Sequence, residues 1–131
     1  MGTSSTPDST SARSGAGVTC RQARELARGL LRRPAVAPER VADVETVVTE
    51  LVSNADRHGG GVTGFRIARR PGGVLIEVSD SSSRLPREQP WAPSEPGGFG
   101  WLLINRLALT DIRHHRSGKT IMATIATATA C

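Results

Sequence analysis

The 131-residue chain has very few aromatic residues: they make up 3% of the sequence, and tyrosine is absent. A hydrophobic core therefore has to come from Val, Leu, Ile and Ala. The shortage also disfavours binding of single-stranded nucleic acid, whose bases stack on aromatic side chains. No internal period indicates a repeat protein. The length suits one domain with a core of its own.

Cysteines are also scarce. Cys20 and Cys131 lack the spacing of a metal site, and secreted disulfide frameworks normally use more cysteines, which favours a reduced, cytoplasmic setting. Residues 1–17 contain no apolar run that a signal peptide or membrane anchor would need. Their Ser-, Thr- and Gly-rich composition predicts a disordered tail, and no membrane association is expected.

The charge balance is basic, with a net charge of +5 and a pI near 10.9. Such a balance suits an anionic partner: nucleic acid, a membrane surface or a polyphosphate ligand. The basic residues occur in short pairs, such as Arg32-Arg33 and Arg69-Arg70, and not in one run or helical stripe. This scatter favours a protein that does not bind nucleic acid directly.

Two helices are predicted in the first half of the chain. Apolar residues recur at helical spacing from Val18 to Arg33, with Thr19 as a candidate N-cap. A second, strongly periodic helix is expected to begin at Pro38 and to stop at the glycines 59–61.

The second half alternates hairpins with one helix. The expected elements are two paired strands at 62–69 and 74–79, a long loop at 80–98, a helix near 101–107, and two paired strands at 110–115 and 119–127. Because strands follow one another through hairpins, a Rossmann or P-loop unit is excluded. We expect a two-layer α/β (α+β) sandwich with a mixed, mostly antiparallel sheet and helices on one face.

Chemistry is suggested by Glu50, Asn54 and His58, which are spaced by four residues on one face of the second helix. A carboxylate one turn from a carboxamide supplies oxygen ligands for Mg²⁺ and a base for a hydroxyl or a water molecule. A solvated helix face can show the same spacing by chance.

Three further segments add to this pattern. Asp80 ends a β-rich run, which places a carboxylate at the mouth of the sheet, although it also fits a turn cap. Glycines 97, 98 and 100 precede a helix whose first N–H groups can face phosphate oxygens, or they form a hinge. Thr120, at the start of the last strand, has a hydroxyl that can complete a polar pocket or simply mark an edge strand.

Together these motifs resemble the GHKL (Bergerat-fold) ATPase superfamily: Glu50-Leu-Val-Ser-Asn54-Ala-Asp-Arg-His58, Val78-Ser-Asp80, Gly98-Phe-Gly100-Trp-Leu-Leu-Ile104 and Gly118-Lys-Thr120. The short length and the lead helix are similar to the RsbW-like anti-sigma-factor serine kinases of actinobacteria. The resemblance covers about Val18 to Ile125.

The resemblance implies an ATP-binding domain over 18–127, with 128–131 as a C-terminal tail. Asn54 would bind the Mg²⁺ that bridges the phosphates, Glu50 would act as general base on the acceptor hydroxyl, and Asp80 would accept from the adenine amino group.

The same resemblance assigns the supporting residues. The backbones of Gly98 and Gly100 would approach the phosphates under a lid at about 83–97. Thr120 would lie near the adenine through water, and His58 would close the lower wall of the site.

Two features depart from the family pattern. Serines 81–83 stand where a glycine usually follows the aspartate, and Phe99 stands where these kinases commonly have arginine. Glu50 favours a kinase that phosphorylates an antagonist protein and sequesters a sigma factor, with a possible homodimer implied by the resemblance. Ser82 and Phe99 favour the alternative, a degenerate module that regulates a partner by binding it.

Overall fold

The computed structural model describes residues 11–32, 34–83 and 100–127. These ranges leave out most of the expected tail, nearly all of the expected lid, Gly98, Phe99 and residues 128–131. The elements are β1 (Ser11–Ser14), α1 (Cys20–Leu30), α2 (Pro38–His58), β2 (Val62–Arg70), β3 (Gly73–Asp80), α3 (Gly100–Leu107), β4 (Leu109–His115) and β5 (Gly118–Ala126).

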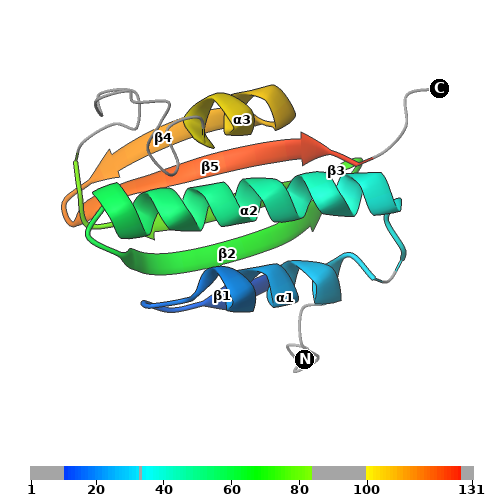
Figure 1. Ribbon diagram of the computed structural model, residues 1–131, viewed down its shortest axis with the longest axis horizontal. Helices are drawn as coiled ribbons and strands as arrows, with labels where there is room; N and C mark the ends of the chain where they lie inside the picture. The colour runs from blue at the N-terminus through cyan, green and yellow to red at the C-terminus, as the bar shows by residue number, and fades with distance from the viewer. Residues whose placement is uncertain (1–10, 33, 84–99, 128–131) are drawn as a thin grey trace, which may run out of the picture.

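One five-stranded sheet forms a layer of the molecule, in the order β1-β2-β3-β5-β4, and the three helices cover one of its faces (Figure 1). The expected two-layer α/β sandwich is confirmed. All strand pairs among the described residues are antiparallel, so the parallel pairing of a mixed sheet is not found there. The α3 crossover joins β3 and β4, which could have paired in parallel. Strand β5 lies between them and pairs antiparallel with both.

For residues 11–14, the structure corrects the expectation that residues 1–17 form a disordered tail. Ser11 to Ser14 form the edge strand β1, which pairs with β2 from Ala68 to Phe65. These four residues have no marked strand propensity of their own. They form a strand because their backbone groups pair with the edge of β2.

The helix boundaries follow the sequence signals closely. Thr19 caps α1 through a capping box, in which its hydroxyl accepts from the Gln22 N–H at 3.0 Å and its own N–H donates to Gln22 Oε1 at 3.0 Å. Helix α2 begins at Pro38, and the chain leaves it through Gly60 and Gly61, whose φ angles are +78° and +102°. None of the described helices has the length and apolar content needed to span a membrane.

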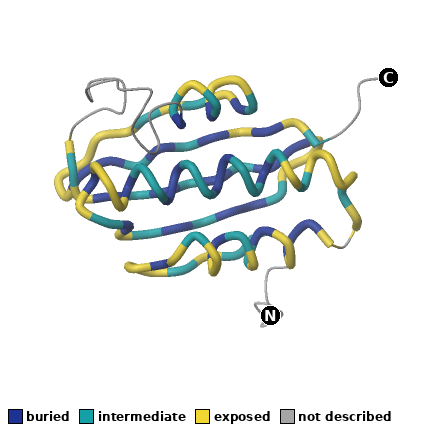
Figure 2. Tube along the Cα trace, viewed as in Figure 1, coloured by how far each residue is buried: buried dark blue, intermediate teal, exposed yellow. Residues whose placement is uncertain are grey.

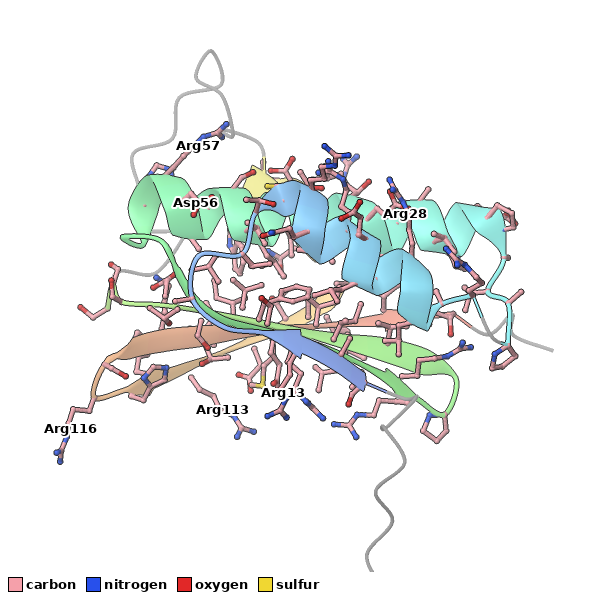
Figure 3. All side chains as sticks on the ribbon, turned by 90° about the horizontal axis from the view of Figure 1, so that it is seen from below. Arg13, Arg28, Asp56, Arg57, Arg113 and Arg116 are labelled. Carbon is pink, nitrogen blue, oxygen red and sulfur yellow. The ribbon has the colours of Figure 1, made fainter. Side chains whose placement is uncertain are left out.

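The core lies between α2 and the sheet. Figure 2 shows buried positions, in dark blue, along α2 and along the central strands. The core residues are Val44, Val47, Val48, Leu51, Val52 and Ala55 on α2, and Ile67, Ile76, Val78, Ile121 and Ala123 on the sheet. None of the described helices lies on the other sheet face, and Arg13 and Arg113 project from it (Figure 3). Packing of its buried face on the sheet holds α2 in place, with its C-terminal half beside α3.

Candidate functional site

The first part of the site lies where α3 begins beside α2, and we call Glu50, Asn54 and Gly100 the α2–α3 cluster. Glu50 and Asn54 are half-buried and one turn apart, and Gly100 is buried as the first residue of α3. A methyl group on Gly100 would collide with Glu50 Oε2 and lie 3.7 Å from Asn54 Oδ1. Glycine thus allows α3 to start in contact with both side chains, and the structure brings these three predicted residues together.

The α2–α3 cluster has unused oxygen atoms. Within the described residues, neither Glu50 nor Asn54 forms a hydrogen bond or an ion pair. No group of three His, Cys, Asp or Glu side chains able to hold a metal occurs in that part of the chain. Mg²⁺ commonly uses only one or two protein ligands and completes its shell with water and phosphate oxygens. The donor set therefore fits a Mg²⁺ ion that arrives with a polyphosphate.

The second part of the site surrounds Asp80, and we call Asp80, Ser82 and Lys119 the Asp80 cluster. Asp80 and Lys119 are each only 3% exposed, and the Lys119 ammonium lies 2.9 Å from Asp80 Oδ1. The Ser82 N–H donates to the same oxygen at 2.9 Å, and Lys119 donates to the Ser82 carbonyl at 3.2 Å. The backbone of Ser82, at the position where a glycine was expected, thus takes part in this network.

Two glycines make room for the Asp80 cluster. A methyl group on Gly59, the C-cap of α2, would lie 2.5 Å from Asp80 Oδ2. At Gly118 the φ angle is +145°, and a methyl group would overlap the Asp80 carbonyl oxygen. Gly59 follows Asn54 by five residues, about 8 Å along the helix axis. The two clusters therefore lie near the same end of α2.

Thr120 does not join the Asp80 cluster, and its expected position near the adenine stays a prediction. Its hydroxyl bonds to Ser79 Oγ at 2.7 Å and to His115 Nε2 at 3.1 Å, on the sheet face without helices. Lys119 is the β5 residue that pairs with Asp80 and points to the helix side. The buried positions Ile121 and 123, in phase with Lys119, are the sequence signal that could have identified it.

The remaining predicted residues are less informative. His58 is exposed at the last position of α2 and makes no hydrogen bond or ion pair within the described ranges, so its role as the lower wall of the site stays a prediction. The neighbouring Asp56 and Arg57 are exposed, and Arg57 points away from the sheet (Figure 3). Gly98 lies outside the described residues.

The sequence matches the family of histidine kinase-like ATPase domains over residues 16–125, and the chain belongs to this family. Domains of this kind generally bind ATP, usually with Mg²⁺. No curated protein matches the chain in sequence.

One solved structure with a similar fold is the histidine kinase domain of the blue-light activated histidine kinase from Erythrobacter litoralis EL346. It is 21% identical, with a TM-score of 0.49 over 68% of the present chain. The match spans 45% of that kinase chain, so the present protein corresponds to less than half of its length.

Proposed function

We propose that this domain binds ATP with Mg²⁺ at the end of α2 and acts as an anti-sigma-factor-type serine/threonine protein kinase. The observation that carries the proposal is the α2–α3 cluster, in which a carboxylate and a carboxamide lie side by side without protein partners among the described residues. A nucleotide-binding site needs an oxygen ligand for the metal, and phosphoryl transfer to a hydroxyl also benefits from a base.

Each residue has a separate role in this proposal. Bound ATP would supply the γ-phosphoryl group, and Mg²⁺ would neutralise phosphate charge. Asn54 Oδ1 would be the metal ligand. The Glu50 carboxylate would take the proton of the acceptor hydroxyl as that oxygen bonds to the γ-phosphorus. The bond from the γ-phosphorus to the β–γ bridging oxygen would break in the same step, and ADP would leave. The Asp80 carboxylate would accept a hydrogen bond from the adenine amino group.

The proposed partners are an antagonist protein, which carries the acceptor hydroxyl, and a sigma factor, which the free kinase would sequester in the cytoplasm. We propose these partners because the sequence resembles the RsbW-like kinases. The net charge of +5 also suits acidic protein surfaces, and Arg13 and Arg113 project from the uncovered sheet face. A homodimer is proposed on the resemblance alone, and sedimentation velocity would test it.

A non-catalytic binding module is the second candidate, and the Asp80 cluster favours it. Lys119 and the Ser82 N–H both occupy Asp80 Oδ1. An adenine amino group would have to use Oδ2, beside Gly59, or displace Lys119. If neither occurs, the domain would regulate a partner by binding it without nucleotide.

Calorimetric titration of the protein with ATP, with and without Mg²⁺, tests the site. We expect saturable binding that Asn54→Ala weakens by at least about tenfold in the presence of Mg²⁺, because a metal ligand is lost. The matched control is Asn105→Ala, which removes the other asparagine of the chain from an exposed position on α3. Equal weakening by both substitutions would contradict the site assignment.

Transfer of labelled phosphate from ATP to candidate antagonist proteins separates the two functions. Glu50→Gln should keep ATP binding and lower the transfer rate by about 100-fold or more, the usual contribution of a general base. Glu39→Gln, an exposed site in the first turn of α2, serves as the control. ATP binding without transfer to any antagonist protein would favour the binding module.

A further inference from the structure

Lys119 is unusual within this chain. It is the one lysine among 17 basic residues, and it is 3% exposed. A buried ion pair contributes little net stability, because the desolvation of both charges offsets their attraction. Fold stability alone therefore gives little reason for a charged pair at the position where the proposed function places the nucleobase.

Among the residues that the structure describes, the hydrogen bonds of the pair leave one donor and one acceptor unused. The Lys119 ammonium has three N–H groups, of which one donates to Asp80 Oδ1 and one to the Ser82 carbonyl. Asp80 Oδ1 accepts from Lys119 and from the Ser82 N–H, whereas Oδ2 accepts from no described residue. One N–H and one carboxylate oxygen of this touching pair thus have no hydrogen-bond partner among the described residues.

The backbone holds these two groups in place. Asp80 and Lys119 are directly opposed in the β3–β5 ladder, so their side chains leave the sheet on the same face. Gly59 and Gly118 allow helix α2 and the start of β5 to approach the aspartate more closely than any other residue would. The ammonium and the carboxylate therefore form a rigid pair with little freedom to separate.

An adenine ring carries a donor and an acceptor side by side, namely its 6-amino group and N1. On the basis of the proposed function, we infer that Lys119 is a base-recognition residue that donates a hydrogen bond to adenine N1 while Asp80 accepts from the 6-amino group. Because Lys119 and Asp80 are 2.9 Å apart, a base whose amino group reaches Asp80 also turns N1 toward the ammonium. Lys119 thereby determines specificity for a base with an unprotonated N1 next to an amino group.

The test compares ATP with 1-deaza-ATP, in which a C–H replaces N1, on the full chain and on Lys119→Met. Calorimetry with Mg²⁺ gives the four dissociation constants of this cycle. We expect the unaltered protein to bind ATP about tenfold more tightly than 1-deaza-ATP, as a hydrogen bond from a charged donor predicts. We expect Lys119→Met to bind both nucleotides equally, since the donor to N1 is gone. A purely structural role of Lys119 would weaken both nucleotides alike and leave their ratio unchanged.

Two outcomes overturn the inference while leaving the proposed function intact. One is an ATP to 1-deaza-ATP ratio that is the same in the unaltered protein and in Lys119→Met. The other is tighter ATP binding by Lys119→Met, which would make the lysine a competitor of the base. No ATP binding by the unaltered protein would instead overturn the proposed function, and the inference with it.

Removal of the lysine leaves the Asp80 carboxylate buried without its cation, so the variant can fail to fold. The double variant Asp80→Asn, Lys119→Met removes both charges together and keeps a carbonyl oxygen for the 6-amino group. Circular dichroism establishes folding before titration. The double variant should also bind ATP and 1-deaza-ATP equally, and a preserved tenfold preference in it would contradict the inference.

Discussion

The two halves of the candidate site differ in how far their polar side chains are buried and in whether those side chains are bonded to each other. In the α2–α3 cluster, Glu50 and Asn54 are half-buried and have no partner among the described residues. In the Asp80 cluster, Asp80 and Lys119 are almost fully buried and bonded to each other. A half-exposed carboxylate can keep its water until a ligand arrives, whereas a buried one needs a partner for the protein to fold.

The difference separates function from stability. The α2–α3 cluster should matter for ligand and metal binding and hardly for folding, since Glu50 and Asn54 form no hydrogen bond or ion pair among the described residues. The Asp80 cluster should matter for both, because its interactions exist before any ligand binds. The free energy of unfolding of matched variants measures this contrast directly.

The largest loss of stability is expected from Lys119→Met. It leaves the Asp80 carboxylate buried without a counter-ion, which typically costs about 3–5 kcal/mol. Urea unfolding followed by circular dichroism gives the change in the free energy of unfolding. The double variant Asp80→Asn, Lys119→Met should lose clearly less than the single variant, and an equal loss would show that the ion pair is not the cause.

A slightly smaller loss, about 3 kcal/mol, is expected for Gly118→Ala. Its φ angle of +145° is unfavourable for alanine, and the added methyl group would overlap the Asp80 carbonyl oxygen. Gly29→Ala is the matched control, because Gly29 lies exposed in α1 with no atom within 4 Å of an added methyl group. This control should gain up to about 1 kcal/mol from helix propensity, and its destabilisation would contradict this reasoning.

Much smaller changes are expected in the α2–α3 cluster. Glu50→Gln and Asn54→Ala should each alter the free energy of unfolding by no more than about 0.5 kcal/mol without ligand, because no hydrogen bond or ion pair among the described residues is lost. The same urea titrations, run beside the Asp80 cluster variants, provide the comparison. A loss above about 2 kcal/mol in either variant would mean that the two halves of the site do not differ as described.

The smallest effect is expected for the exposed ion pair between Arg28 and Glu45. Its two hydrogen bonds are 2.9 Å long, the same as the Lys119–Asp80 distance, but the Arg28 side chain is 51% exposed. Arg28→Gln should therefore shift the unfolding midpoint far less than Lys119→Met, and 1 M salt should remove the difference from the unaltered protein. A shift as large as that of Lys119→Met would show that distance, and not burial, decides the contribution.

The same pair should show no pH dependence near neutrality. Hydrogen bonding and the charge of Glu45 raise the pKa of Arg28 above its ordinary value. When the pKa of a cationic group is higher in the folded state, its contribution to stability is fully present below the pKa of the unfolded state. That contribution is lost only as the pH rises through the pKa of the folded state. That range is strongly alkaline, so the effect of Arg28→Gln should be constant from about pH 6 to about pH 9.

Local signals accounted for most of the fold. The N-cap Thr19 and the proline and glycines that bound α2 are short-range features whose physical effects depend on neighbouring residues only. Both hairpins followed from turn residues between β-rich runs. Strand β1 could not be predicted in the same way, because Ser11 to Ser14 form a strand only by pairing with β2.

Within the site, the order of residues along the chain already places Glu50 and Asn54 on one helix face, since helical spacing depends on local geometry. The residue types available to the site also follow from the sequence. The contact of Gly100 with these two residues, and the position of Lys119 rather than Thr120 opposite Asp80, depend on how distant segments pack together. Strand residues alternate between two faces, so a shift by one position exchanges the side chains that face the site. The pairing of β3 with β5 sets that position, and this pairing joins segments 39 residues apart in the chain.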